Sequence, residues 1–116
     1  MKTTITELKA KLESPSYGGR VTIEGELTFI KKRYSQDIEV YHNSNPRGGN
    51  YPIDTLSDND EIQKVLEMNE QYIKDDQQLK EKGFKYQGKG LYSKKDSEGN
   101  WKHAMLYWGE TPRILR

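Results

Sequence analysis

Residues 57–84 place the strongest constraint on the fold, because they have the pattern of one long amphipathic helix with a marked start and end. The segment 57–61 offers several N-cap side chains, and its acids suit the positive end of the helix dipole. If Gly83 takes the left-handed position after the helix, Leu79 and Phe84 form the hydrophobic pair of a Schellman motif. We therefore predict a helix from about Asn59 to Lys82, followed by a sharp reversal. The apolar residues at helical spacing are Ile62, Val65, Leu66, Tyr72, Ile73 and Leu79.

A shorter helix is predicted near the start of the chain. Thr4 and Glu7 have the spacing of a capping box. The pair Ser14-Pro15 ends the helix, since the residue before a proline is pushed out of the helical region. Its apolar stripe consists of Ile5, Leu8 and Leu12.

Alternating apolar and polar residues predict two hairpins, one on each side of the long helix. Residues 21–29 alternate as one strand, interrupted by Gly25, and residues 37–41 pair with it. In the second hairpin, residues 84–93 form one strand across Gly88-Lys89-Gly90, and residues 101–108 form the other. The order α-β-β-α-β-β favours an α+β fold, in which an antiparallel sheet of two hairpins has both amphipathic helices packed on one face.

The length of 116 residues suits a single domain over residues 1–116. Within it we predict a flexible loop at about residues 42–56 and a short basic tail at 110–116. The loop is a candidate for disorder or for contacts with a partner, and Arg47 at its tip is the candidate contact residue.

The composition predicts a small core and excludes several kinds of site. Hydrophobic and charged residues each make up 32% of the chain, so aromatic rings must supply much of the core. The absence of cysteine excludes disulfides, thiolate metal sites and thiol catalysis, and it is compatible with a reducing cytosol. No apolar run could span a bilayer, and the first residues do not resemble a signal peptide. We expect a cytoplasmic protein without membrane contact.

Charge is distributed unevenly along the chain, although the net charge is only +1. Residues 57–78 carry two lysines against seven acids, whereas residues 79–116 carry nine Lys/Arg against four acids. Such polarised surfaces tend to meet charged partners, or to neutralise each other on folding.

Four carboxylates are predicted to share the exposed face of the first hairpin: Glu24, Glu26, Asp37 and Glu39. Like charges that face each other across strands are destabilising, so something should compensate them. Solvent, salt or the basic segment 31–33 could do so, as could a partner with a basic surface. A divalent metal is the least favoured alternative, because no sequence pattern fixes a cage of oxygen ligands.

The second hairpin is basic and rich in aromatic residues, a combination that single-stranded nucleic-acid binders use. The alternative reading of these rings is that they form the core, and the small net charge also weakens a nucleic-acid role. The candidate nucleic-acid contacts are Lys85, Tyr86, Lys89, Tyr92, Lys94, Lys95 and Lys102, with Trp101 or Trp108.

Nothing in the sequence has the pattern of a catalytic site. His42 and His103 are the only histidines, and no serine lies in a nucleophile-elbow motif. The loop around Arg47 lacks the spacing of a phosphate-binding loop. We expect neither catalysis nor a cofactor, with a small enzyme that uses a metal or His42 as the remote alternative.

The short length, the Lys/Asn/Tyr-rich composition and the lack of an enzyme motif resemble those of the small accessory proteins of phages and mobile elements. That class includes inhibitors of host defence nucleases. The resemblance is one of composition and assigns no role to any residue. Together with the charge pattern, it favours a non-enzymatic module that docks onto a protein with a basic or nucleic-acid-binding surface, with single-stranded nucleic acid as the alternative partner.

Overall fold

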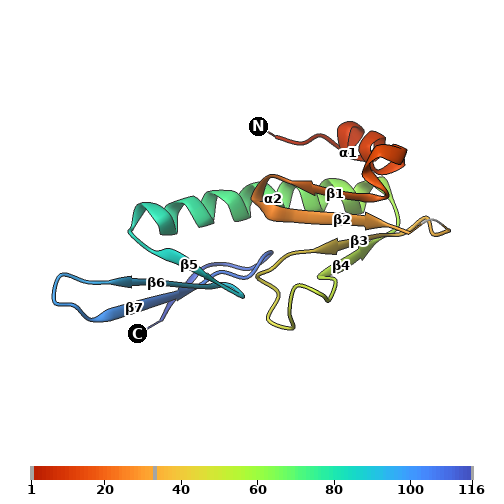
Figure 1. The fold of residues 1–116 in the computed structure, drawn as a ribbon. Coiled ribbons are helices and arrows are strands. Elements are labelled where there is room, and N and C mark those ends of the chain that lie inside the picture. Colours follow the sequence, from red (N-terminus) through yellow and green to blue (C-terminus); the bar gives the residue numbers. More distant parts are fainter. Residues whose placement is uncertain (1, 33, 116) are drawn as a thin grey trace.

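Helix α2 (Asn59–Glu81) runs along most of an elongated molecule and carries one four-stranded antiparallel sheet on each half (Figure 1). The computed structural model describes residues 2–32 and 34–115, and the molecule measures 55 × 27 × 24 Å. The predicted α+β class is confirmed, and the order of elements is close to the predicted one. The described residues, however, contain eight strands rather than four, and these form two sheets rather than one.

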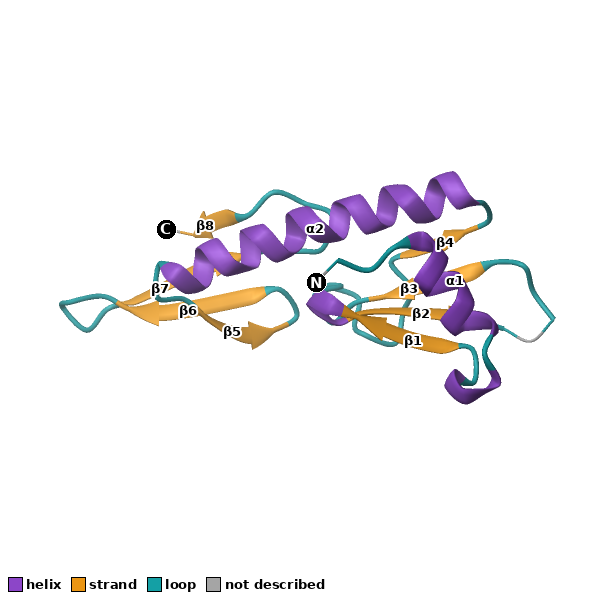
Figure 2. Cartoon of the chain, turned by 90° about the horizontal axis from the view of Figure 1, so that it is seen from above, coloured by secondary structure: helices purple, strands orange, loops and turns teal. Residues whose placement is uncertain are grey.

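The first lobe consists of the first half of α2, helix α1 and a sheet with the order β1-β2-β3-β4. Both helices pack on one face of this sheet (Figure 2). Its core joins Leu8 and Leu12 of α1 to Ile62, Val65 and Leu66 of α2 through the inward side chains of the strands. The elements are α1 (Ile5–Glu13), β1 (Arg20–Ile23), β2 (Leu27–Lys31), β3 (Ile38–Tyr41) and β4 (Asp54–Leu56), with short 3-10 turns η1 (Pro15–Tyr17) and η2 (Glu24–Glu26).

The second lobe consists of the second half of α2 and a sheet with the order β5-β6-β7-β8. Tyr72 and Leu79 of α2 pack on the sheet, against a core that includes Phe84, Tyr92 and Leu106. Its strands are β5 (Lys85–Gly88), β6 (Leu91–Lys95), β7 (Trp101–Met105) and β8 (Arg113–Leu115).

Both helices have the predicted ends. Thr4 and Asp58 accept the backbone N–H groups of Glu7 and Glu61 at 3.2 and 2.9 Å. At the end of α2, Gly83 has a φ of +93°, and the N–H of Phe84 donates to the carbonyl of Leu79 at 3.1 Å. This is the bond that defines the predicted Schellman motif.

The predicted strands 21–29 and 84–93 are wrong, because each is a hairpin of two strands. In the first, Ile23 pairs with Leu27 across η2, where Gly25 and Glu26 have φ angles of +79° and +59°. In the second, the chain turns at 88–90 between β5 and β6. Glycine permits such backbone angles without steric cost, which accounts for its place in both turns.

Two further strands lie in segments that we predicted to be irregular. The end of the predicted loop 42–56 forms β4, which pairs with β3, and Ser44 and Asn45 inside the loop are buried. The predicted tail 110–116 contains β8, which pairs with β7. Arg116 lies outside the described residues.

Candidate functional site

The four predicted carboxylates do not share one face. Glu24 and Glu26 lie in the η2 turn, at one end of the first sheet, whereas Asp37 and Glu39 lie at and beside the start of β3, at the other end. The prediction failed because it placed Glu24 and Glu26 inside a continuous strand.

Glu24 is held within the fold. Its two carboxylate oxygens accept the backbone N–H and the hydroxyl of Thr3, each at 2.6 Å. Burial alone would raise the pKa of Glu24, but the hydrogen bonds from Thr3 outweigh it and lower the pKa below its ordinary value. Glu26 is exposed and accepts the side-chain amide of Asn43 at 3.3 Å.

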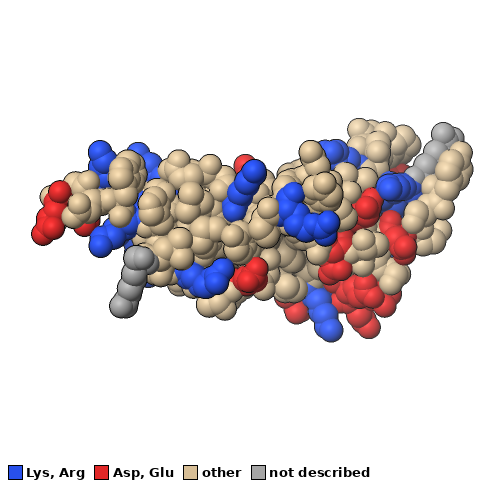
Figure 3. Space-filling view, turned by 90° about the horizontal axis from the view of Figure 1, so that it is seen from below, with Lys and Arg blue, Asp and Glu red and all other residues tan. Residues whose placement is uncertain are grey.

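A different set of acids does gather, on the part of the first lobe formed by β3, β4 and the start of α2 (Figure 3). We call this set the acidic surface. Among the described residues, ion pairs join Lys2 to Glu70, Lys32 to Glu39 and Lys80 to Asp76. Of the acidic surface, only Glu39 takes part in one of them; Arg33, a predicted neutralising residue, lies outside the described residues. The members are Asp37, Asp54, Asp58 and Asp60, which are exposed, with the partly buried Glu39 and Glu61.

Most of this surface was not predicted from the sequence. Asp54 was not considered because β4 was predicted as loop, and the acids of α2 were expected to face a partner along the outer side of the helix rather than to join the first hairpin. The run of acids at 58–61 was the available signal. That β4 pairs with β3, and so brings these acids beside Asp37 and Glu39, was not predictable from spacing.

Four lysines of the second lobe line a cleft of about 590 Å³, together with Trp101 and one acid, Asp96. We call it the basic cleft; its lysines are Lys82, Lys85, Lys94 and Lys95. Three of these were predicted contacts, and Lys82 was not. The predicted contacts Lys89 and Lys102 are exposed but do not line the cleft, since Lys89 lies in the turn between β5 and β6.

Two of the predicted stacking rings are not available to a ligand. Tyr92 is fully buried and its hydroxyl donates to Asp76. Tyr86 is half-buried and its hydroxyl donates to Asn43 Oδ1 at 2.7 Å. Trp101 is the exception, with 59% of its surface exposed. The alternative that these rings form the core therefore holds for Tyr92, whereas Trp101 is open to solvent.

His42 is buried and takes part in a closed hydrogen-bond network. Its Nε2 donates to the carbonyl of Gly25 at 2.9 Å, and its Nδ1 accepts the N–H of Ser44 at 3.0 Å. The hydroxyl of Ser44 lies 2.8 Å from Nδ1 and accepts the backbone N–H of Trp108 at 2.8 Å. Burial lowers the pKa of His42 below its ordinary value. A neutral ring with both nitrogens engaged has no free position for a substrate.

The same network joins the two lobes, and we call it the polar junction. The indole N–H of Trp108 donates to Asn69 of α2 at 3.1 Å, and Asn69 donates to the carbonyl of Glu24 at 2.9 Å. The Trp108 side chain packs against both cores. His42 and Trp108 are therefore structural residues at the contact between the lobes.

The other candidates, His103 and Arg47, each lie beside a neighbouring side chain. His103 Nδ1 lies 2.8 Å from the hydroxyl of Ser93, and the Arg47 guanidinium lies 5.0 Å from the centre of the exposed Tyr51 ring. Within residues 2–32 and 34–115, no three His, Asp or Glu side chains are placed to hold a metal ion.

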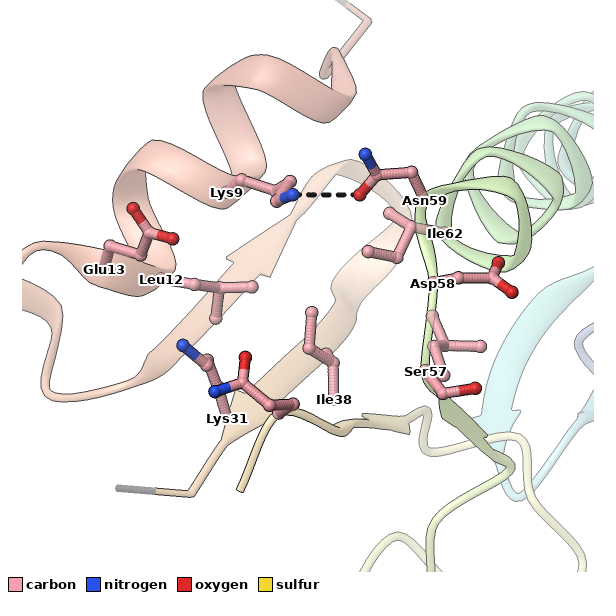
Figure 4. Close-up of a pocket in the computed structure, with 11 residues that line it drawn as sticks. Lys9, Leu12, Glu13, Lys31, Ile38, Ser57, Asp58, Asn59 and Ile62 are labelled. Atoms are coloured by element: carbon pink, nitrogen blue, oxygen red, sulfur yellow. Dashed lines mark hydrogen bonds between the residues drawn. The ribbon is translucent and has the colours of Figure 1, made fainter. Parts of the chain in front are cut away.

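A smaller cleft of about 150 Å³ lies between α1, the start of α2 and strands β2 and β3 (Figure 4). Lys9 Nζ donates to Asn59 Oδ1 across it at 2.9 Å. Its rim carries both signs of charge, with Lys9 and Lys31 against Glu13 and Asp58. It therefore favours neither anions nor cations, and we assign it no ligand.

Of the helices in the described part of the chain, neither has the length and apolar character needed to cross a membrane. Comparison of the chain with family models, curated proteins and solved structures finds no match.

Proposed function

We propose that the protein is a non-enzymatic binding module that docks its acidic surface onto the basic surface of another protein. One observation carries the proposal: six acids gather over β3, β4 and the start of α2, and five of them take part in none of the ion pairs among the described residues. Gathered like charges repel one another, and a partner of opposite charge would relieve that repulsion.

The geometry supports docking rather than catalysis. Both histidines are hydrogen-bonded within the fold, and the acidic surface is spread over three elements. Complementary charge of this kind chiefly increases the rate of association, by roughly 10- to 1000-fold, and makes binding sensitive to salt.

A protein whose own task is to bind nucleic acid is the partner that fits best, because its surface already carries the required positive charge. An inhibitor of a nuclease would act in this way, by covering the channel that otherwise holds the phosphate backbone. Such an inhibitor would fit the class of accessory proteins that the composition resembles.

The test is capture of partners from the source cell by the tagged protein, with and without nuclease treatment of the lysate. A partner that survives nuclease treatment is held by protein contacts and not by a nucleic-acid bridge. We expect the triple variant Asp37→Lys, Asp54→Lys and Asp60→Lys to lose that partner, because it reverses exposed charges that cap no helix.

The matched control reverses three exposed acids outside the acidic surface: Glu81→Lys, Glu98→Lys and Glu110→Lys. The control should retain the partner, and far-UV circular dichroism should show both triple variants folded. Capture that is unaffected by the first variant, or lost equally in both, would show that the acidic surface is not the docking site.

A further inference from the structure

The basic cleft lies in the second lobe, away from the acidic surface, and needs an explanation of its own. Lys82 follows the last residue of α2, Lys85 lies on β5, and Lys94 and Lys95 lie on β6. Folding thus brings together four cations, from two strands and from the residue that caps the end of α2. The rest of the lining is one carboxylate, the Trp101 ring, Gly83 and three neutral polar residues. The carboxylate is Asp96, and the polar residues are Gln87, Ser93 and Ser97.

The one carboxylate of the cleft is bound to backbone rather than to lysine. Asp96 Oδ1 accepts the N–H groups of Glu98 and Asn100, each at 2.9 Å, in the turn between β6 and β7. These hydrogen bonds, led by that of Asn100, lower the pKa of Asp96. None of the four lysines takes part in the ion pairs formed among the described residues. The cleft therefore keeps a net positive charge.

The lysines are also partly ordered before any ligand binds. Lys94 Nζ donates to the carbonyl of Lys82 at 2.8 Å and lies 4.6 Å from the centre of the Phe84 ring. An ammonium group has three N–H donors, so Lys94 retains two for an anion. A cation held in place loses less conformational entropy on binding than a free lysine does.

Trp101 adds a flat apolar surface at the edge of these charges. More than half of its surface is exposed, and Lys95 Nζ lies 5.1 Å from the centre of the ring. A cation beside an exposed indole suits a ligand whose phosphate and aromatic base are joined in one unit. Stacking requires an unpaired base, which a single strand offers and the interior of a duplex does not.

We propose that the basic cleft binds single-stranded nucleic acid, with its lysines on successive phosphates and one base stacked on Trp101. The strand is held mainly through its backbone, so binding is independent of sequence and strongly dependent on salt. This site is separate from the acidic surface, and neither proposal depends on the other.

Fluorescence anisotropy of a labelled oligothymidylate of roughly 16 nucleotides tests the proposal. If each of the four lysines neutralises one phosphate, a plot of the logarithm of the binding constant against the logarithm of the salt concentration should have a slope of about −3. Raising the salt from about 50 to about 200 mM should then weaken binding roughly 50-fold. No binding at the lower salt concentration would overturn the proposal, and so would a slope near zero.

Variants localise the site. The double variant Lys85→Glu, Lys95→Glu should weaken binding by more than about 10-fold, because two phosphate contacts are lost. Trp101→Ala, which removes the stacking surface, should weaken binding roughly 5- to 150-fold. Lys89→Glu is the control, since it reverses an exposed lysine of the same lobe that lies outside the cleft. The affinity of this variant for the oligonucleotide should stay within about 3-fold of that of the unmodified protein.

Two competitors separate the strand from other polyanions. If a duplex of the same length bound as tightly as the oligothymidylate, the cleft would not be a site for single strands. Equally tight binding of polyglutamate would also overturn the proposal, and would indicate that the ligand of the cleft is an acidic protein. Should a charge-reversed variant fail to fold, Lys95→Gln and the salt dependence of the unmodified protein still decide the outcome.

Discussion

Replacement of Ser44 by alanine removes the one hydroxyl that links a buried histidine of the first lobe to the backbone of the second. Ser44 is fully buried, and its Oγ accepts the Trp108 N–H at 2.8 Å. It also lies 2.8 Å from His42 Nδ1, which keeps a second donor, the Ser44 N–H at 3.0 Å. The variant therefore leaves one group without a partner: the Trp108 N–H.

The cost follows from that single group. A buried donor left without an acceptor costs about 1–3 kcal/mol, whereas removal of one small side-chain atom leaves little space and adds almost nothing. Against a total stability of about 5–15 kcal/mol for a natural domain, this loss is measurable. We expect the free energy of unfolding of Ser44→Ala to fall by about 2 kcal/mol.

Urea denaturation followed by Trp108 fluorescence measures this change, in a Trp101→Phe background so that only the junction indole reports. Ser97→Ala, at an exposed site in the turn between β6 and β7, is the control and should change the free energy of unfolding by less than about 0.5 kcal/mol. A loss of less than about 0.5 kcal/mol in Ser44→Ala would refute the reasoning, because the Trp108 N–H would then have another partner.

Two other perturbations probe the junction and the turns. Burial lowers the pKa of His42, despite the nearby carboxylates of Glu26 and Asp76. Below about pH 6.5 the unfolded chain therefore binds a proton that the folded protein does not, and the free energy of unfolding should decrease as the pH is lowered. This decrease should be much smaller in His42→Gln. Urea midpoints at about pH 7.5 and pH 5 measure the loss. Gly90→Ala should destabilise more than Gly99→Ala: both glycines have positive φ, but only at Gly90 would the added carbon lie 2.7 Å from the Tyr107 ring. We expect a difference of roughly 1–3 kcal/mol in their free energies of unfolding, and equal values would contradict the clash.

Local patterns predicted the helices to within a residue or two but could not separate a strand from a tight hairpin. Val21, Ile23, Leu27 and Phe29 are buried, and the three-residue turn η2 keeps odd-numbered residues on the core side of both strands. Alternation is therefore the same for one long strand and for two short paired ones. Gly25, which interrupts the alternation, was the available signal of a turn, but the strand was predicted to continue through it.

The division into two sheets could have been anticipated from the length of α2. A helix of 23 residues is about 34 Å long, whereas strands of three to five residues span roughly 10–17 Å. One small sheet cannot cover such a helix, and its apolar stripe continues from Ile62 to Leu79.

The polar junction could not have been predicted, because it joins residues far apart in the chain. Ser44 contacts Trp108, and Asn69 contacts Glu24. Short polar residues in a Gly-rich segment look solvated in sequence, and only the tertiary contacts show that His42, Ser44 and Asn45 are buried.

The continuity of α2 has a consequence for how the molecule unfolds. Residues 62–66 of the helix belong to the first core and residues 72–79 to the second. Loss of either sheet would expose half of the apolar stripe and leave that half of the helix without tertiary support, which isolated helices of this length need in water. The two lobes should therefore melt in one cooperative transition, and an excised lobe should not fold unless it retains α2 and a cover for its bare face.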